Sequence, residues 1–415
     1  MEDRRSAEIT SVEEFKRGWK IVLLAGIGLA CGLGAIPIYT SGVLTAKLTV
    51  EFSWSKAEVQ GIYSWFTLGN LIAAPILGWM VDKRGVRNIT LFSIIGMALG
   101  MASLGLFTGP LWTFYLIAFL TAIVGVGTVP ITWTRLIVDW FDVSRGKALG
   151  IALAGTGVSA TFLPVYATWL ITEFGWRFTY LGLAALPAFI AFPLAYFFLW
   201  DRRENIDTGN NNEIKDNFMQ KGLKVTEVLY GYRYWVINLA FVIIGLSIAG
   251  LISNFVLMLI DRDISLIDGA KIAGVIGPSV IAGRLITGYL VDRFWAPGVA
   301  LVLLSLPAIS CLILATGFGG VGAAMFAAIL IGLAAGAEFD LMSFLVSRYF
   351  GQRNYGLIYS FLYAVFKISA GIGAPLFGYV KDTYNTYDPI LFLSSGLLIG
   401  GSMLLLTLGR YRYSN

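Results

Sequence analysis

The chain has 415 residues, of which 57% are hydrophobic and only 13% are charged, and its net charge is +5. Soluble domains carry about 25% charged residues, so this composition excludes an ordinary soluble protein and favours a membrane protein. Histidine is absent from the sequence, which removes the commonest metal ligand and the usual proton carrier near neutral pH. We therefore expect no metal, no cofactor and no enzymatic activity.

Twelve apolar runs are long enough to cross a bilayer, which takes about 20 helical residues. In chain order they lie at residues 20–44, 57–81, 88–108, 111–138, 147–171, 176–200, 233–260, 270–291, 298–318, 321–346, 355–380 and 389–409. The sequence predicts an all-α membrane protein with two six-helix bundles, a polar linker and two short polar tails. These parts are the tail 1–19, the bundle 20–200, the linker 201–229, the bundle 230–409 and the tail 410–415.

Lysine and arginine are distributed unevenly between the two ends of these spans. If the N-terminus is cytoplasmic, 21 of them fall in cytoplasmic segments and six in outer segments, and Arg135, Arg284 and Lys367 lie within apolar runs. Positive residues accumulate on the cytoplasmic side of membrane proteins, so we expect both termini there. This placement explains the net charge without a nucleic-acid partner. The compact chain favours a monomer in a bacterial inner membrane.

A repeat relates the two halves of the chain. The stretch "GWMVDKRG" begins at Gly78 and "GYLVDRFW" begins at Gly288, an offset of 210 residues. Roughly the same offset relates "RGKALG" to "RNYGLI". Two parallel six-helix halves with a binding site between them, near the bilayer midplane, are typical of secondary transporters.

Two cations are predicted near the middle of the membrane. Lys367 lies thirteen residues after Asn354 and fourteen before Lys381, about 20 Å from either marker along a helix. A lysine or arginine at this depth costs about 2.5–3.5 kcal/mol on insertion scales. Arg284 can bind a carboxylate through two parallel hydrogen bonds. We expect both to bind an anionic substrate, and the alternative is a structural ion pair.

Other polar residues form a second group of candidates. Glu338 and Asp340 are two residues apart and point to different sides of one helix. Either could neutralise Arg284 or carry a proton, and we favour Glu338, because Asp340 lies nearer to Arg348 at the membrane edge. Candidate cavity-lining residues, each of which could instead be a packing residue, are Tyr39, Tyr63, Asn70, Trp133, Asn254 and Tyr363. Arg135 is expected to pair at a gate or to reach the membrane surface.

The stretch "GWMVDKRGVR" resembles the signature G-x-x-x-D-[RK]-x-G-x-R of the major facilitator superfamily. The resemblance implies that family's twelve-helix fold and a conformational latch. In this chain the latch residues would be Gly78, Asp82, Lys83, Gly85 and Arg87, and in the second copy Asp292 and Arg293. The second copy lacks the later glycine and arginine, so we expect a weaker latch there.

Within that superfamily, several stretches resemble the monocarboxylate transporter and oxalate/formate antiporter group. They include "WFDVSRGKALGIALAGTGVSATFLP" (140–164), "GRLITGYLVDR" (283–293) and "SRYFGQRNYGLIYS" (347–360). Two positions depart from the animal carriers. Val280 replaces an acidic residue four before Arg284, and the first span has no lysine. Lys367 is in the helix that carries the binding lysine of the oxalate/formate branch, but about one and a half turns later.

These observations predict a secondary transporter for a small mono- or dicarboxylate, working by alternating access with proton symport or anion exchange. Its partners would be the carboxylate, protons in the case of symport, and the lipid bilayer. Two alternatives stay open. One is a cation or drug exporter that uses Glu338 and Asp340, and the other is a non-transporting membrane sensor on the same fold.

Overall fold

The computed structural model describes residues 11–54, 56–199, 222–264, 266–317 and 319–413. The first ten residues of the predicted N-terminal tail, most of the predicted linker and the last two residues of the C-terminal tail lie outside this description. Within the described part, helices cover nearly the whole chain and no strand occurs. Ten helical stretches in this part are long and apolar enough to cross a membrane, which confirms an integral membrane protein of the all-α class.

Each of the twelve predicted spans contains one helix or consecutive helical segments. The first half comprises α1 (Ser11–Ala30), α2 (Ile36–Phe52), α3 (Lys56–Arg84), α4 (Arg87–Gly105), α5 (Leu111–Val124), α6 (Pro130–Trp140), α7 (Arg145–Glu173), α8 (Gly175–Leu186) and α9 (Phe192–Phe198). The second half comprises α12 (Val225–Tyr230), α13 (Tyr232–Ile260), α14 (Leu266–Gly274), α15 (Ile276–Val291), α16 (Ala296–Thr316), α17 (Gly320–Phe350), α18 (Tyr355–Tyr384) and α19 (Asp388–Leu404).

The first and fourth spans are each broken near their middle, and the two breaks touch. The backbone N–H of Leu33, between α1 and α2, donates to the hydroxyl oxygen of Thr128, between α5 and α6, at 3.0 Å. A Cβ atom on Gly32 would lie 2.5 Å from the carbonyl oxygen of Thr128, so only glycine permits this approach. Proline follows each break, as Pro37 and Pro130, where it suits the first turn of a helix.

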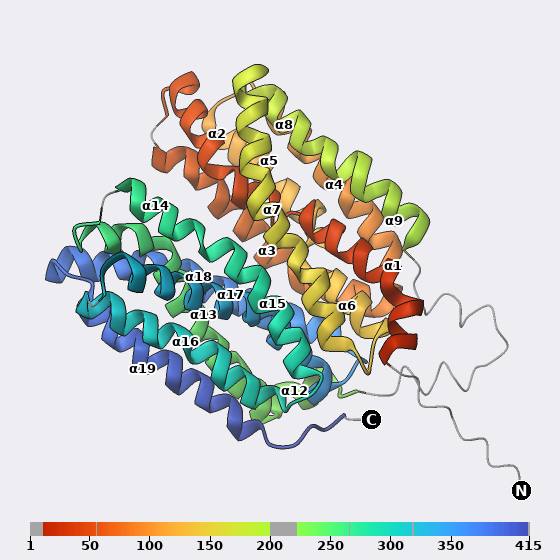
Figure 1. Cartoon of the computed structure of the whole chain (residues 1–415). Coiled ribbons are helices and arrows are strands. Elements are labelled where there is room, and N and C mark those ends of the chain that lie inside the picture. The colour runs from red at the N-terminus through yellow and green to blue at the C-terminus, as the bar shows by residue number, and fades with distance from the viewer. Residues whose placement is uncertain (1–10, 55, 200–221, 265, 318, 414–415) are drawn as a thin grey trace, which may run out of the picture.

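The two halves lie side by side and are closest at the end that carries both termini (Figure 1). There α3 packs on α18 and α7 packs on α15. Glycine makes both contacts possible, because a Cβ on Gly78 would lie 2.4 Å from the Gly356 carbonyl oxygen, and one on Gly288 the same distance from that of Gly146. Gly78 and Gly288 are 210 residues apart, as are Gly146 and Gly356. The residues of the sequence repeat therefore form two equivalent helix contacts between the halves.

Candidate functional site

A cavity lies between the two halves, part way along α3 and α18. The first half contributes an apolar wall from the break between α1 and α2, and one face of α3. The second half contributes the middle of α18. The lining residues are Leu33, Pro37, Ile38, Tyr63, Phe66, Thr67, Asn70, Leu71, Tyr363, Ala364 and Lys367. The spacing of 63, 66, 67 and 70 is that of a single helix face, which explains why these four residues line the cavity together.

Lys367 is the cation of this cavity. Its Nζ lies 5.5 Å from the ring centre of Tyr363 and 5.7 Å from that of Phe339, so aromatic faces surround it on its own half. Its side chain is half-buried. Lys367 forms no ion pair with any residue that the structure describes. The ammonium group therefore lines the cavity without an ion-pair partner among the described residues.

Arg284 is placed differently, although the sequence predicted the same role. It is 4% exposed, and its Nη1 lies 3.8 Å from Oδ1 of Asp340 on α17. The guanidinium carbon is 6.0 Å from the ring centre of Phe339, the ring that also faces Lys367. Its Nε and Nη1 have no hydrogen-bond partner in the described structure. Arg284 is thus charge-compensated, with donor capacity left over.

Of the two carboxylates of α17, Asp340 and not the favoured Glu338 forms the ion pair with Arg284. Asp340 pairs with Arg284, whereas Arg348 pairs with Asp142 of the first half at 3.3 Å. The pairing expected for Glu338 is therefore made by Asp340, and Asp340 is a central group instead of one at the membrane edge. Glu338 is buried and close enough to both Arg284 and Lys367 to interact with them electrostatically.

The remaining predicted lining residues separate into two groups. Tyr63 and Tyr363 both line the cavity with Lys367. Tyr39 packs against the apolar core of the first half, and Asn254 accepts a hydrogen bond from the hydroxyl of Tyr387 at 3.5 Å. Tyr39 and Asn254 are therefore absent from the lining of this cavity.

Sequence reasoning missed a column of tyrosines on α18. Tyr355 and Tyr359 stack with ring centres 5.6 Å apart, and Tyr359 lies 6.3 Å from Tyr363. The hydroxyl groups of Tyr355 and Tyr359 are buried and have no hydrogen-bond partner in the described structure. Their spacing of four residues was the available signal. This column joins the cavity to the end of the molecule that carries the termini.

Asp82 connects the halves at that end. Its carboxylate accepts hydrogen bonds from the backbone N–H of Gly356 at 3.0 Å and of Leu357 at 2.9 Å. These N–H groups begin α18, where the helix dipole favours a negative charge. Arg135 lies 3.7 Å from Asp82 and is 1% exposed, so it pairs at the contact between the halves instead of reaching the surface.

The other predicted latch residues shape the turn after α3. Gly85 has φ +79°, a conformation that glycine adopts without strain. Lys83 Nζ lies over the Trp79 ring at 4.5 Å, and Arg87 donates to the carbonyl oxygen of Tyr196 at 3.3 Å. These contacts stay within the first half, whereas the carboxylate of Asp82 contacts the second half.

Asp292 makes the equivalent contact from the second half. Its carboxylate accepts from the backbone N–H of Gly146 at 2.6 Å and of Lys147 at 2.9 Å, at the start of α7. Neither distance is longer than its counterpart at Asp82, so the missing glycine and arginine do not lengthen this contact. Arg293 instead lies over the ring of Tyr289 at 4.1 Å. Burial raises the pKa of Asp292 to about 6, although the backbone hydrogen bonds oppose the shift.

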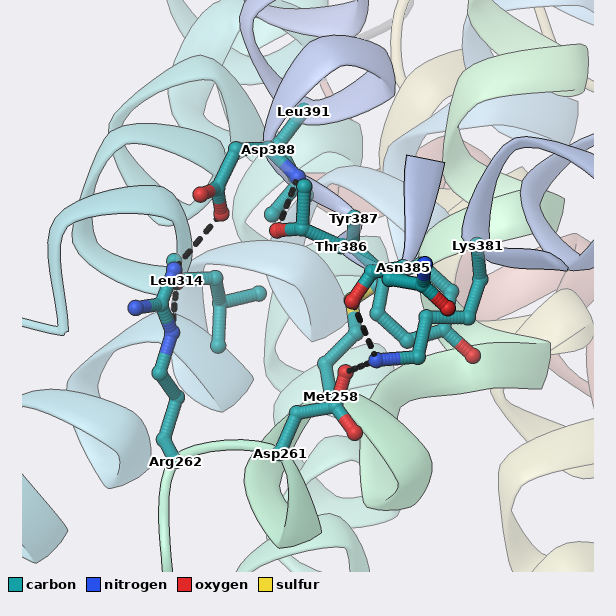
Figure 2. Close-up of a pocket in the computed structure, with 10 residues that line it drawn as sticks. All are labelled: Met258, Asp261, Arg262, Leu314, Lys381, Asn385, Thr386, Tyr387, Asp388 and Leu391. Carbon is teal, nitrogen blue, oxygen red and sulfur yellow. Dashed lines mark hydrogen bonds and ion pairs between the residues drawn. The ribbon is translucent and has the colours of Figure 1, made fainter. Parts of the chain in front are cut away.

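A second pocket lies at the opposite end of the second half (Figure 2). Arg262 donates to the carbonyl oxygen of Leu314 at 3.1 Å and pairs with Asp388 at 2.6 Å. Lys381 pairs with Asp261. These contacts tie together the ends of α13, α16, α18 and α19. Because its cations are paired within one half, this pocket is a structural brace, not a site between the halves.

Comparison with known proteins identifies a family and several similar proteins. The family described as "Major Facilitator Superfamily" matches residues 21–374. Monocarboxylate transporter 13 of Rattus norvegicus is 25% identical over 409 residues, which cover 95% of this chain and 89% of that protein. The cis,cis-muconate transport protein of Acinetobacter baylyi is 22% identical over 284 residues, 66% of this chain and 67% of its own.

Solved structures share the fold at lower identity. The proton:xylose symporter XylE superposes with a TM-score of 0.76 at 13% identity, over 95% of this chain and 96% of its own. The human organic anion transporter MFSD10 superposes with a TM-score of 0.73 at 15% identity, over 93% and 99% respectively. At these identities the likeness concerns the arrangement of helices alone.

Proposed function

Because this chain belongs to the Major Facilitator Superfamily, we propose that it moves a small organic anion, a mono- or dicarboxylate, across the membrane by alternating access. The family establishes a membrane transporter, not an enzyme. The class of anion, the coupling of its transport to protons or to a second anion, and the orientation of the protein in the membrane are our proposals. Relatives named for monocarboxylate and muconate transport are consistent with an anionic substrate.

The observation that carries the proposal is the state of Lys367. It is a lysine deep in the membrane whose ammonium faces a cavity between the halves and pairs with no described carboxylate. A lysine that forms no ion pair at this depth is costly, and a substrate carboxylate beside it would lower that cost. Lys367 is therefore the proposed primary anchor, and Tyr63, Tyr363, Thr67 and Asn70 would orient the rest of the substrate.

Arg284 has a supporting part in this proposal. Its pairing with Asp340 leaves its charge balanced in the empty carrier. Its unused N–H groups could donate hydrogen bonds to the substrate carboxylate if Asp340 moves aside. Arg284 and Lys367 carry two positive charges, and Asp340 and Glu338 can carry two negative ones. A monoanion would therefore leave the site with one excess negative charge, unless a proton enters with it.

Glu338 is the proposed carrier of that proton. It interacts electrostatically with both cations, so a bound anion beside Lys367 would weaken the stabilisation of its ionised form. In proton symport, Glu338 would be protonated when the anion is bound and would release its proton with the anion. In anion exchange, a second anion would bind before the carrier returns to its first conformation. A pH gradient drives uptake in the first case only.

The contacts between the halves indicate which side is closed. The carboxylates Asp82 and Asp292 hold the halves together at the end that carries the termini. With both termini in the cytoplasm, as the lysine and arginine distribution predicts, the cavity would open to the outside in this conformation. Release to the cytoplasm would then require both carboxylates to leave their helix ends. A bacterial inner membrane and a monomeric state remain our proposals.

The test is uptake into proteoliposomes of three probe anions, lactate, succinate and benzoate, each measured with and without an inward proton gradient and in counterflow. We expect Lys367→Gln to lower anion uptake at least tenfold, because hydrogen bonds to charged groups are worth about 1.5–3 kcal/mol. Lys381→Gln is the matched control, since it removes the same charge from the same helix outside the cavity. It should retain uptake within about twofold.

The outcomes separate the alternatives. Full anion uptake by Lys367→Gln would remove the proposed anchor. Uptake of amines with no uptake of any anion would favour a cation or drug exporter that uses Glu338 and Asp340. Binding of an anion without flux in wild-type protein would favour a sensor on the same fold.

A further inference from the structure

The first turns of α1 dock on the loop that precedes α7. The Glu14 carboxylate accepts hydrogen bonds from three successive backbone N–H groups of that loop. They belong to Asp142 at 2.6 Å, Val143 at 3.3 Å and Ser144 at 2.7 Å. Three successive N–H groups form a small anion-binding concavity. In this chain a carboxylate of the same half occupies it.

Packing around Glu14 fixes the same contact. The hydroxyl groups of Ser11 and Ser144 are 2.5 Å apart, and the rings of Phe15 and Phe141 have centres 5.2 Å apart. A Cβ on Gly18 would lie 2.3 Å from the Phe141 ring. Successive turns of α1 therefore follow the loop closely, so the loop and the start of α1 behave as one unit.

The same loop bears the contacts to the second half. Asp142 accepts from Arg348 through both its carboxylate, at 3.3 Å, and its carbonyl oxygen, at 3.0 Å. Directly after the loop, Arg145 donates to the Ser347 hydroxyl at 3.1 Å, and Gly146 and Lys147 donate to Asp292. Glu14 thus supports, from inside one half, the segment that meets the other half.

The second half contains a related but uncharged arrangement. The N–H of Leu223 donates to the carbonyl oxygen of Phe350 at 3.0 Å, and the Asn354 side chain donates to the carbonyl oxygen of Leu223 at 2.8 Å. In both halves, therefore, the segment entering the first span holds the loop before the fifth. Lys224 stands 210 residues after Glu14, so the carboxylate is particular to the first half.

We propose that Glu14 is a positioning residue for closure of the terminus-bearing end, because it holds residues 142–144 where Asp142 meets Arg348 and where α7 meets Asp292. The side chain touches neither the cavity nor Lys367, so its effect reaches transport through the closed conformation alone. This inference rests on the proposed alternating access, but its first readout is conformational and needs no substrate.

The experiment places spin labels at Arg84 and Phe294, exposed positions at that end of opposite halves, and measures the distance distribution between them in lipid nanodiscs. Both native cysteines are buried. We expect Glu14→Ala to lower the ratio of closed to open molecules about tenfold, since it removes three hydrogen bonds to a charged group. Glu14→Gln keeps one acceptor oxygen and should give a smaller shift. Lys16→Gln, the control, removes an exposed charge two residues later on α1 and should leave the distribution unchanged.

Size-exclusion profiles and thermal unfolding of the same variants distinguish positioning from folding. A lower unfolding temperature for Glu14→Ala with an unchanged distance distribution would overturn the proposal, as would an equal shift in Lys16→Gln. If the distribution shifts as expected while wild-type protein transports no anion, the proposed substrate fails and the role of Glu14 stands.

Discussion

At the scale of single residues, two cations in the same half have different surroundings. Arg284 is buried and forms an ion pair with Asp340, whereas Lys367 faces a cavity, lies near two aromatic rings and forms no ion pair with a described residue. Substitution of the two residues should therefore have different effects on stability. Loss of Arg284 leaves the buried carboxylate of Asp340 without its ion-pair partner, whereas loss of Lys367 breaks no ion pair with a described residue.

This difference predicts the stability of variants at the Arg284 pair. Asp340→Asn should lower the free energy of unfolding by about 3–5 kcal/mol, because it removes the ion-pair partner of a buried guanidinium. The double variant Arg284→Met with Asp340→Leu should recover most of that loss, since it removes both charges. Thermal unfolding in detergent measures both. Additive losses in the double variant would contradict the pairing.

The sequence predicted these charged residues and a possible ion pair with Arg284, but it favoured Glu338, and the structure has Asp340 as the partner. Glu338 and Asp340 lie on the same helix, two residues apart. From the sequence alone, both are at a depth along the helix axis that would allow contact with Arg284. Which one makes the ion pair depends on the rotation of α17 against α15, where Gly283 and Gly336 let the backbones approach. That rotation is set by packing across the whole helix pair, which a local pattern does not contain.

At the scale of elements, the closed end consists of two helix N-termini, each bound by a carboxylate of the opposite half. Asp82 binds the start of α18 and Asp292 binds the start of α7. Asp292 lies just beyond the end of its span, so pH can reach it.

The pKa of Asp292 predicts how pH acts on this contact. In the closed conformation burial raises the pKa from 3.8 to about 6, and opening would expose the carboxyl and return its pKa toward the ordinary value. The closed conformation therefore binds the proton more tightly, so the closed fraction should rise as pH falls from 7 to 5. The distance distribution measured across this range tests the prediction.

Asp292→Asn should remove this pH dependence, because the amide does not titrate. A closed fraction that falls with acid in wild-type protein, or that rises equally in Asp292→Asn, would assign the pH response to another group.

Glycine contacts at the same end predict a steric effect. Gly356→Ala places a Cβ 2.8 Å from the carbonyl oxygen of Gly78, which is backbone and cannot rotate away. The closed conformation should lose about 1–3 kcal/mol, seen as a longer distance between labels on the two halves. Gly371→Ala is the control on the same helix, since its Cβ would meet nothing within 4 Å. An equal response of both variants would exclude close packing as the cause.

The sequence predicted the helical segments well and their interruptions poorly. Long apolar runs and the offset of 210 residues were visible in the composition and spacing. The breaks at residues 31–35 and 125–129 were not, because each exists partly through the other: Leu33 finds its hydrogen-bond acceptor in Thr128. Likewise, the sequence showed that Gly146 belongs to a repeat. Its hydrogen bond to Asp292 could not be predicted, because it depends on how the second half packs against the first.

At the scale of the whole molecule, the contacts between the halves described above gather at the terminus-bearing end, and contacts within the second half brace the opposite end (Figures 1 and 2). This distribution suits two rigid bodies that separate at one end and meet at the other. Arg262 and Asp388 belong to the brace, not to the moving interface.

We therefore expect Arg262→Gln to lower the free energy of unfolding by about 1 kcal/mol while leaving the distance distribution at the terminus-bearing end unchanged. Thermal unfolding measures the change in stability, and spin-label distances on the same sample measure the conformation. A large conformational shift would mean that the brace takes part in the motion between the halves.

The length of α18 between its start and Lys367 determines how far a tilt of the helix moves its first turn. Gly356, whose N–H binds Asp82, lies eleven residues before Lys367, a separation of about 16 Å along the helix axis. A tilt of about 5° pivoting at Lys367 would displace the start of α18 by about 1.4 Å, from that length, enough to break a 3.0 Å hydrogen bond. A small reorientation of the helix around a bound anion is thus amplified into release of the closed end, without any bending of the helix between them.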